Sequence, residues 1–105
     1  MLNDPTVLEA SRVLAGKLLK ESKDSEENIR KAFRMVVCRY PSEQELDILK
    51  NYYEGRTQRL KKADAEELLA VGEYPNPPGL DTIQLASLMQ VIASIYNLEE
   101  TISKT

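Results

Sequence analysis

Apolar residues recur at three- and four-residue spacing along most of the chain, which is the pattern of α-helices that bury one face. No stretch alternates apolar and polar residues for long enough to predict a strand. Four long or medium segments and one short segment carry the pattern, so their apolar faces must pack together. The residues expected on these faces are Val7, Ala10, Leu14 and Leu18; Ile29, Ala32, Phe33, Val36 and Val37; Leu46, Leu49, Tyr53, Arg56 and Leu60; Leu68 and Leu69; and Leu85, Leu88, Met89, Ile92, Ile95 and Tyr96.

Residues that favour helix starts precede each segment. Asp4 stands before Pro5, and this pair suits the N-cap and the first position of a helix. Each other segment begins with a Ser or Asp that has a Glu or Gln three residues later, the spacing of a capping box. These pairs are Asp24 with Glu27, Ser42 with Glu45, Asp64 with Glu67, and Asp81 with Gln84.

Helix-breaking residues separate the segments. We expect the second helix to end at residues 39–41, because a residue before a proline avoids the helical conformation. Gly72 is a candidate terminator of the short fourth helix. Three prolines and a glycine within 74–79 predict a loop, which we take as a stiff connector rather than a recognition segment. The sequence thus predicts an all-α bundle of four main helices plus one short helix, with a Pro-rich loop before the last helix.

Length and charge bound the possible partners. The chain has 105 residues, 42% of them hydrophobic, which suits a single domain spanning residues 1–105. The net charge of −3 argues against nucleic acid or an anionic membrane as the main partner, because both attract a concentrated positive surface. No apolar stretch is long enough to span a bilayer, so we expect no membrane insertion. Polar residues follow Met1 and Leu2 directly, where a signal peptide would be apolar, and this start is typical of a C-terminal fragment of a larger protein.

Few side chains in this sequence suit catalysis or metal binding. The absence of histidine removes the commonest general base, and a single cysteine cannot form a CxxC pair or a structural zinc site. That cysteine, Cys38, lies in an apolar run, so we expect a buried thiol. Acidic groups at 26–27, 43–47, 66–67 and 99–100 could bind a cation, but most lie where they stabilise the positive end of a helix. We therefore expect no enzyme, and no catalytic residue, metal site or cofactor in this segment.

A basic stretch with interleaved tyrosines favours one alternative. Its members are Lys50, Arg56, Arg59, Lys61 and Lys62, with Tyr52 and Tyr53. Such a surface can bind single-stranded nucleic acid, and the second and third helices loosely resemble a helix-turn-helix. However, the would-be recognition helix begins with the carboxylates of Glu43, Glu45 and Asp47, which a phosphate-facing surface should not present. We prefer a solvated face.

Several short stretches share their order and spacing with one known family. They read L-N-D-P-T-V and E-A-S-R within 2–12, I-R-K-A-F-R at 29–34, R-Y-P-S-E-Q-E-L at 39–46, L-L-A-V-G-E at 68–73, L-A at 85–86 and N-L-E-E-T-I at 97–102. Together they resemble the C-terminal segment of the planctomycete-type cytochrome c proteins, a domain of unknown function often called planctomycete-specific. Leu88 stands where that family has tryptophan, and Glu99 where it has aspartate.

The resemblance implies a haem-c-bearing bacterial protein outside the cytoplasm, periplasmic or at the cell surface. It places the haem c in upstream parts of the parent protein and implies no catalytic residue or cofactor in this segment. Arg34 and Arg39 lie in the matched stretches. We expect them to hydrogen-bond carbonyls at helix ends or to contact a neighbouring domain.

Three functions stay open. The one we prefer is a non-catalytic interaction or scaffolding domain, whose partner is an upstream domain of the same chain or another protein. It predicts an exposed apolar or arginine-containing patch. The alternatives are a helix-turn-helix-like nucleic-acid-binding module and a part of an active site completed by upstream domains.

Overall fold

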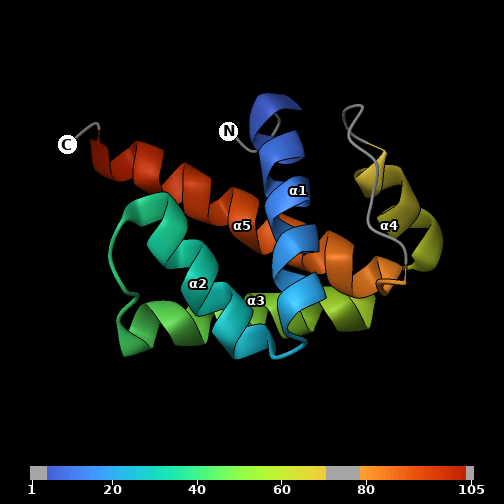
Figure 1. Ribbon diagram of the computed structural model, residues 1–105, viewed down its shortest axis with the longest axis horizontal. Helices are drawn as coiled ribbons and strands as arrows, with labels where there is room; N and C mark the ends of the chain where they lie inside the picture. The colour runs from blue at the N-terminus through green and yellow to red at the C-terminus, as the bar shows by residue number, and fades with distance from the viewer. Residues whose placement is uncertain (1–4, 71–78, 104–105) are drawn as a thin grey trace.

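The structure is a computed structural model that describes residues 5–70 and 79–103. Within these ranges it contains five helices and no strand, which confirms the all-α prediction (Figure 1). The helices are α1 (Pro5–Glu21), α2 (Ser25–Val37), α3 (Glu43–Arg59), the short α4 (Lys62–Leu69) and α5 (Thr82–Ser103). Asp4, Gly72 and the Pro-rich loop apart from Gly79 lie outside the described residues.

The longest helix, α5, is the element on which the others pack. Each of α1, α2, α3 and α4 contacts α5, and α1 crosses in front of it in Figure 1. The predicted core face of α5 is buried, and Tyr96 is partly buried. Several residues beside this face are buried as well, because a helix with neighbours on several sides needs a wide apolar surface. These further residues are Ala86, Ser87, Val91 and Ala93.

The predicted core faces of α2 and α3 are confirmed, while that of α1 is displaced. In α2, Ile29, Ala32 and Phe33 are fully buried, and Leu49 and Tyr53 carry the contact of α3 with the core. In α1 the buried side is formed by Ser11, Arg12, Ala15, Leu18 and Leu19. Ala10 is exposed and Leu14 only partly buried, so part of the predicted apolar stripe of α1 lies at the surface.

Three of the predicted helix caps are present. The Asp24 carboxylate accepts from the backbone N–H groups of Glu26 (3.1 Å) and Glu27 (3.4 Å). Ser42 and Glu45 form a complete capping box, with distances of 3.2 Å from the Glu45 N–H to Ser42 Oγ and 2.9 Å from the Ser42 N–H to Glu45 Oε1. At the start of α5, Asp81 accepts from the backbone N–H of Gln84 at 3.0 Å.

Two details of the predicted caps are wrong. Glu27 does not return a bond to Asp24, whose own N–H donates to Ser22 Oγ at 3.1 Å instead. The helix α4 starts at Lys62, so Asp64 lies in its first turn rather than at its N-cap. The cause is Leu60, which ends α3 in an extended conformation with its side chain buried, and the chain re-enters a helix two residues later.

Cys38 is exposed, which contradicts the prediction of a buried thiol. The helix α2 ends at Val37, and Cys38 is its C-cap in the left-handed region, with φ of 67° and its N–H bonded to the carbonyl of Arg34. A left-handed residue leaves the helical spiral, so its side chain no longer follows the apolar face that ends at Val36. The chain therefore stops the helix before the proline at 41 is reached.

The burial of α5 generates a stability prediction. Replacing Ile92 by alanine should lower the free energy of unfolding by about 2–5 kcal/mol, because Ile92 is fully buried and its removal leaves a cavity. The matched control is Ile48→Ala, since the Ile48 side chain is 66% exposed and its loss should change the stability by less than about 0.5 kcal/mol. Urea unfolding followed by circular dichroism measures both. Equal losses for the two variants would contradict the central position of α5.

Candidate functional site

Arg39 fixes the turn between α2 and α3. Its Nη1 and Nη2 atoms donate to Oε1 and Oε2 of Glu45, each at 2.9 Å, and Nη1 also donates to the carbonyl of Tyr40 at 3.3 Å. The guanidinium lies over the Phe33 ring, 5.0 Å from its centroid. Because Glu45 also caps α3 through Ser42, one carboxylate joins the arginine, the turn and the helix start. The Arg39 side chain therefore makes its contacts within this domain.

The acidity of Glu45 reflects these contacts. The hydrogen bond from Arg39 and, next, that from the backbone of Ser42 lower the pKa of Glu45 to about 2. The same pair raises the pKa of Arg39. Glu45 thus stays ionised at neutral pH, and the turn keeps its ion pair.

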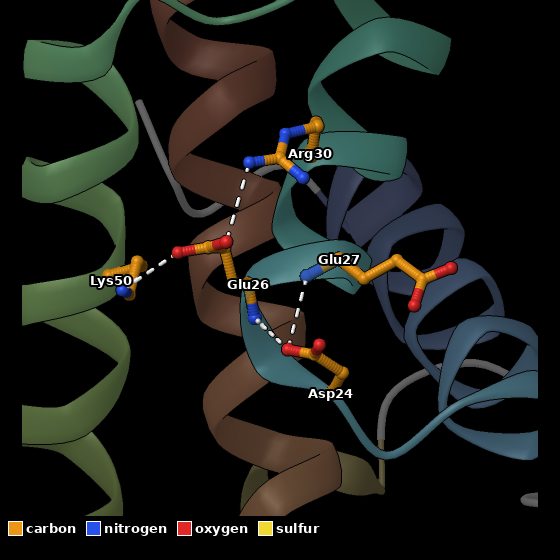
Figure 2. A network of polar contacts seen from close by, with 5 residues as sticks. All are labelled: Asp24, Glu26, Glu27, Arg30 and Lys50. Atoms are coloured by element: carbon orange, nitrogen blue, oxygen red, sulfur yellow. Dashed lines mark hydrogen bonds and ion pairs between the residues drawn. The ribbon is translucent and has the colours of Figure 1, made fainter.

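A second polar network joins α2 to α3 at the start of α2 (Figure 2). Lys50 Nζ of α3 lies 2.9 Å from Glu26 Oε1, and Arg30 Nη2 lies 3.4 Å from Glu26 Oε2. The hydrogen bond from Lys50 is the main cause that lowers the pKa of Glu26. The Glu27 carboxylate points away from Asp24 in Figure 2 and pairs with Lys31 at 3.1 Å. The expected position of Glu26 and Glu27 in the first turn of a helix is confirmed, and Glu26 in addition connects α2 to α3.

Some residues of the basic stretch of α3 make contacts with other helices of the domain. Lys50 is paired with Glu26, Arg56 donates to the side-chain oxygen of Gln90 on α5, and Tyr53 is buried. Three members of the stretch thus hold helices together instead of forming a basic surface. This removes support from the nucleic-acid alternative.

A feature that suits a ligand is a largely apolar groove between α1 and α2. Met35 is 62% exposed, and a hollow lies on either side of it. One hollow, of about 490 Å³, has Ala10, Val13 and Leu14 of α1 and Tyr96 of α5 among its lining residues, with the polar side chains of Thr6, Glu9 and Lys17 also in its lining. We call this feature the Met35 groove; it includes the surface part of the α1 stripe that was predicted to be core.

The second hollow of the Met35 groove has an arginine and a tyrosine at its edge. It measures about 370 Å³, and Leu18, Arg34, Met35 and Tyr40 are among its lining residues. Tyr40 is 64% exposed, and the guanidinium carbon of Arg34 lies 5.1 Å from the centroid of its ring. The two arginines singled out in the sequence therefore differ: Arg39 is engaged inside the turn, whereas Arg34 lies on the groove.

Sequence reasoning missed Met35, although a signal for it was present. The buried face of α2 contains Ile29, Ala32, Phe33 and Val36, which recur at helical spacing. Met35 does not share this spacing, so the pattern places this apolar residue away from the buried face. The exposure of the Tyr40 side chain could not be predicted from apolar spacing, because this exposure depends on the residue at which α2 ends. The burial of Arg12, which is 2% exposed and has a polar partner, also had no signal in the sequence.

Two other kinds of feature, a metal-ion site and a membrane-spanning helix, are absent from the described residues. In residues 5–70 and 79–103, no group of three or more His, Cys, Asp or Glu side chains is placed to hold a metal ion. None of the helices in these same ranges combines the length and the apolar character that crossing a membrane requires.

The fold and these contacts identify the protein as an all-helical bundle domain. Ion pairs connect its helices, and its apolar groove is exposed to solvent. The model of one family, PSD1, "Protein of unknown function (DUF1553)", matches residues 1–53, and the chain belongs to this family. No curated protein and no solved structure matches the chain. The matched residues include the stretches at 2–12, 29–34 and 39–46, so the resemblance to a domain of unknown function is confirmed for this half of the chain.

The Glu45 contacts generate a pH prediction. A glutamate with a folded pKa of about 2 and an unfolded pKa of about 4.3 stabilises the fold above pH 5, and this stabilisation is lost as the pH falls towards 2. Glu45→Gln keeps a cap acceptor but loses the charge, so it should cost about 1 kcal/mol at pH 7, and less as the pH falls. Urea unfolding between pH 7 and pH 2 measures this difference.

The matched control for this measurement is Glu43→Gln, which removes a carboxylate from the same first turn of α3. It should change the stability by less than about 0.5 kcal/mol. A deficit of Glu45→Gln that is as large at pH 2 as at pH 7 would show that the charge of Glu45 is not what stabilises the turn.

Proposed function

We propose that this domain is a non-catalytic docking domain in the C-terminal part of a larger exported bacterial protein of the cytochrome c type. The Met35 groove is the surface on which a preceding domain of the same protein, or a protein partner, binds. The haem c belongs to upstream parts of the parent, and this segment carries no cofactor. The parent works outside the cytoplasm.

The observation that carries the docking function is the composition of the groove. Methionine, tyrosine and arginine are enriched at protein interfaces, and Met35, Tyr40 and Arg34 meet at one edge of it. Ala10 and Leu14 extend the apolar surface along α1. A surface of this kind favours burial against a partner, because contiguous exposed apolar groups are uncommon on a protein that works alone.

The parent protein is proposed from the family resemblance. The chain belongs to a family of unknown function, which agrees with a domain that has no known activity. The stretches that suggest the cytochrome c link lie partly within the matched residues 1–53. The closing stretch at 68–102 lies outside the match and supports the link only through its own residues.

Docking can be tested with the segment that precedes this domain in its parent protein. Titration calorimetry of the two separate pieces should show binding, and a Met35→Ser, Tyr40→Ser variant should weaken it by about tenfold or more, because such side chains supply most of an interface's affinity. Ile48→Ser is the matched control, since Ile48 is an exposed apolar residue on α3 outside the groove. Absence of binding would contradict docking within the parent, and an equal effect of Ile48→Ser would contradict the Met35 groove as the docking surface.

The cytochrome c link has its own test. The parent protein, purified from its natural host, should contain covalently attached haem that stays with the polypeptide after denaturation and absorbs as a c-type haem. Removal of a secretory leader from the mature protein, read by mass spectrometry of its N-terminus, should accompany it. A parent without covalent haem and with an unprocessed N-terminus would refute this part of the proposal and leave the docking function untouched.

A further inference from the structure

The hollow beside Arg34 differs from the rest of the Met35 groove in its charge. Three cations of α2, Arg30, Lys31 and Arg34, line it together with Glu21 and Glu27. Lys31 is held by Glu27 at 3.1 Å, and Arg30 makes the longer of the two contacts to Glu26, at 3.4 Å. Arg34 has no carboxylate within ion-pair distance among the residues that the structure describes, and its contact is the face of the Tyr40 ring.

An arginine stacked on a tyrosine ring, next to apolar side chains, combines the two kinds of contact that a ligand with both a charged and an apolar group needs. The guanidinium has a planar fork of donors that matches a carboxylate, and stacking on Tyr40 holds this fork in place. The exposed side chains of Met35 and Tyr40 supply apolar surface next to it, and the buried Leu18 is a further lining residue. A ligand that fits must therefore carry a carboxylate and a bulky apolar group a few ångströms apart.

We infer that this hollow binds an acidic-apolar segment of a protein, in which an Asp or Glu carboxylate meets Arg34 and a neighbouring apolar side chain lies against Met35. The inference rests on the proposed docking function and names the chemistry of the partner. The volume of about 370 Å³ is at the low end of the range for ligand pockets, about 300–1,000 Å³, and suits one or two side chains.

The surrounding charges favour such a segment over a polyanion. Glu21 and Glu27 lie in the same hollow as Arg34, and the chain as a whole has a net charge of −3. A nucleic acid or an anionic membrane would bring many negative charges against these carboxylates. A single carboxylate can reach Arg34 while its apolar neighbour occupies the uncharged part of the hollow.

The test is a selection of displayed random peptides against the intact domain, with the Met35→Ser variant used to remove peptides that bind elsewhere. The enriched peptides should carry Asp or Glu next to a large apolar residue. Resynthesis of one such peptide with the acid replaced by its amide should weaken binding by about tenfold, and so should Arg34→Gln, because a charge-assisted hydrogen bond is lost in each case. Binding should also weaken when the salt concentration is raised from about 50 mM to about 500 mM.

The control for charge is Lys20→Gln, which removes an exposed cation from the last turn of α1, outside both hollows. It should leave the peptide affinity unchanged, while Arg34→Lys should retain part of it. Enriched peptides without carboxylates, or an affinity that is the same in Arg34→Gln, would overturn the inference. So would a single-stranded oligonucleotide that binds the hollow when no peptide does.

This outcome is separable from that of the docking function. If the preceding segment of the parent binds, and Met35→Ser, Tyr40→Ser weakens it but Arg34→Gln does not, the docking function holds and the acidic-apolar ligand is refuted. If acidic-apolar peptides bind through Arg34 and the preceding segment does not bind, the ligand chemistry holds and docking within the parent is refuted.

Discussion

The fold depends on the burial of α5 against the other helices. Four helices pack on this one element, so each of them needs only a single apolar face, while α5 is apolar over most of its circumference and has a partly exposed side at Gln90 and Ser94. Residues as small as Ala86 and Ala93 have the same burial as Leu88 and Ile95. Such an arrangement lets a chain of 105 residues build one core with few aromatic side chains, because aliphatic residues from five helices meet along one axis.

Several charged residues contribute to the geometry of this bundle. Arg39 and Glu45 hold the α2–α3 turn, Glu26 at the start of α2 pairs with Lys50 in the middle of α3, and Arg56 reaches α5 through Gln90. These contacts are partly exposed, so each adds little stability alone. Their joint effect is to set the direction in which α3 leaves α2, and with it the position of Tyr40.

The Met35 groove follows from how α1 and α2 divide their apolar residues. Both helices direct one set of side chains to α5, and both have an apolar residue left over at the surface: Ala10 on α1 and Met35 on α2, with the partly buried Leu14 beside the groove. An apolar surface that the core does not use is a cost to a protein in water, which is why we connect it with a partner. The ring of Tyr40 and the guanidinium of Arg34 close one edge of this surface and give it a charge preference.

The sequence by itself determined the local structure. Apolar spacing located the five helices, and the caps at Asp24, Ser42 and Asp81 were readable because they depend on residues three positions apart. The tertiary structure alone decided which apolar residues are core: α1 is rotated so that Ser11 and Arg12 face inward and Ala10 faces outward, and Cys38 leaves the helix in a left-handed cap. The candidate site was predicted only in part, since Arg34 was singled out but Met35 and Tyr40 were not. Apolar periodicity indicates that a helix has an apolar side. The helices that cover this side come from distant parts of the chain, so no local pattern predicts which of its residues stay uncovered.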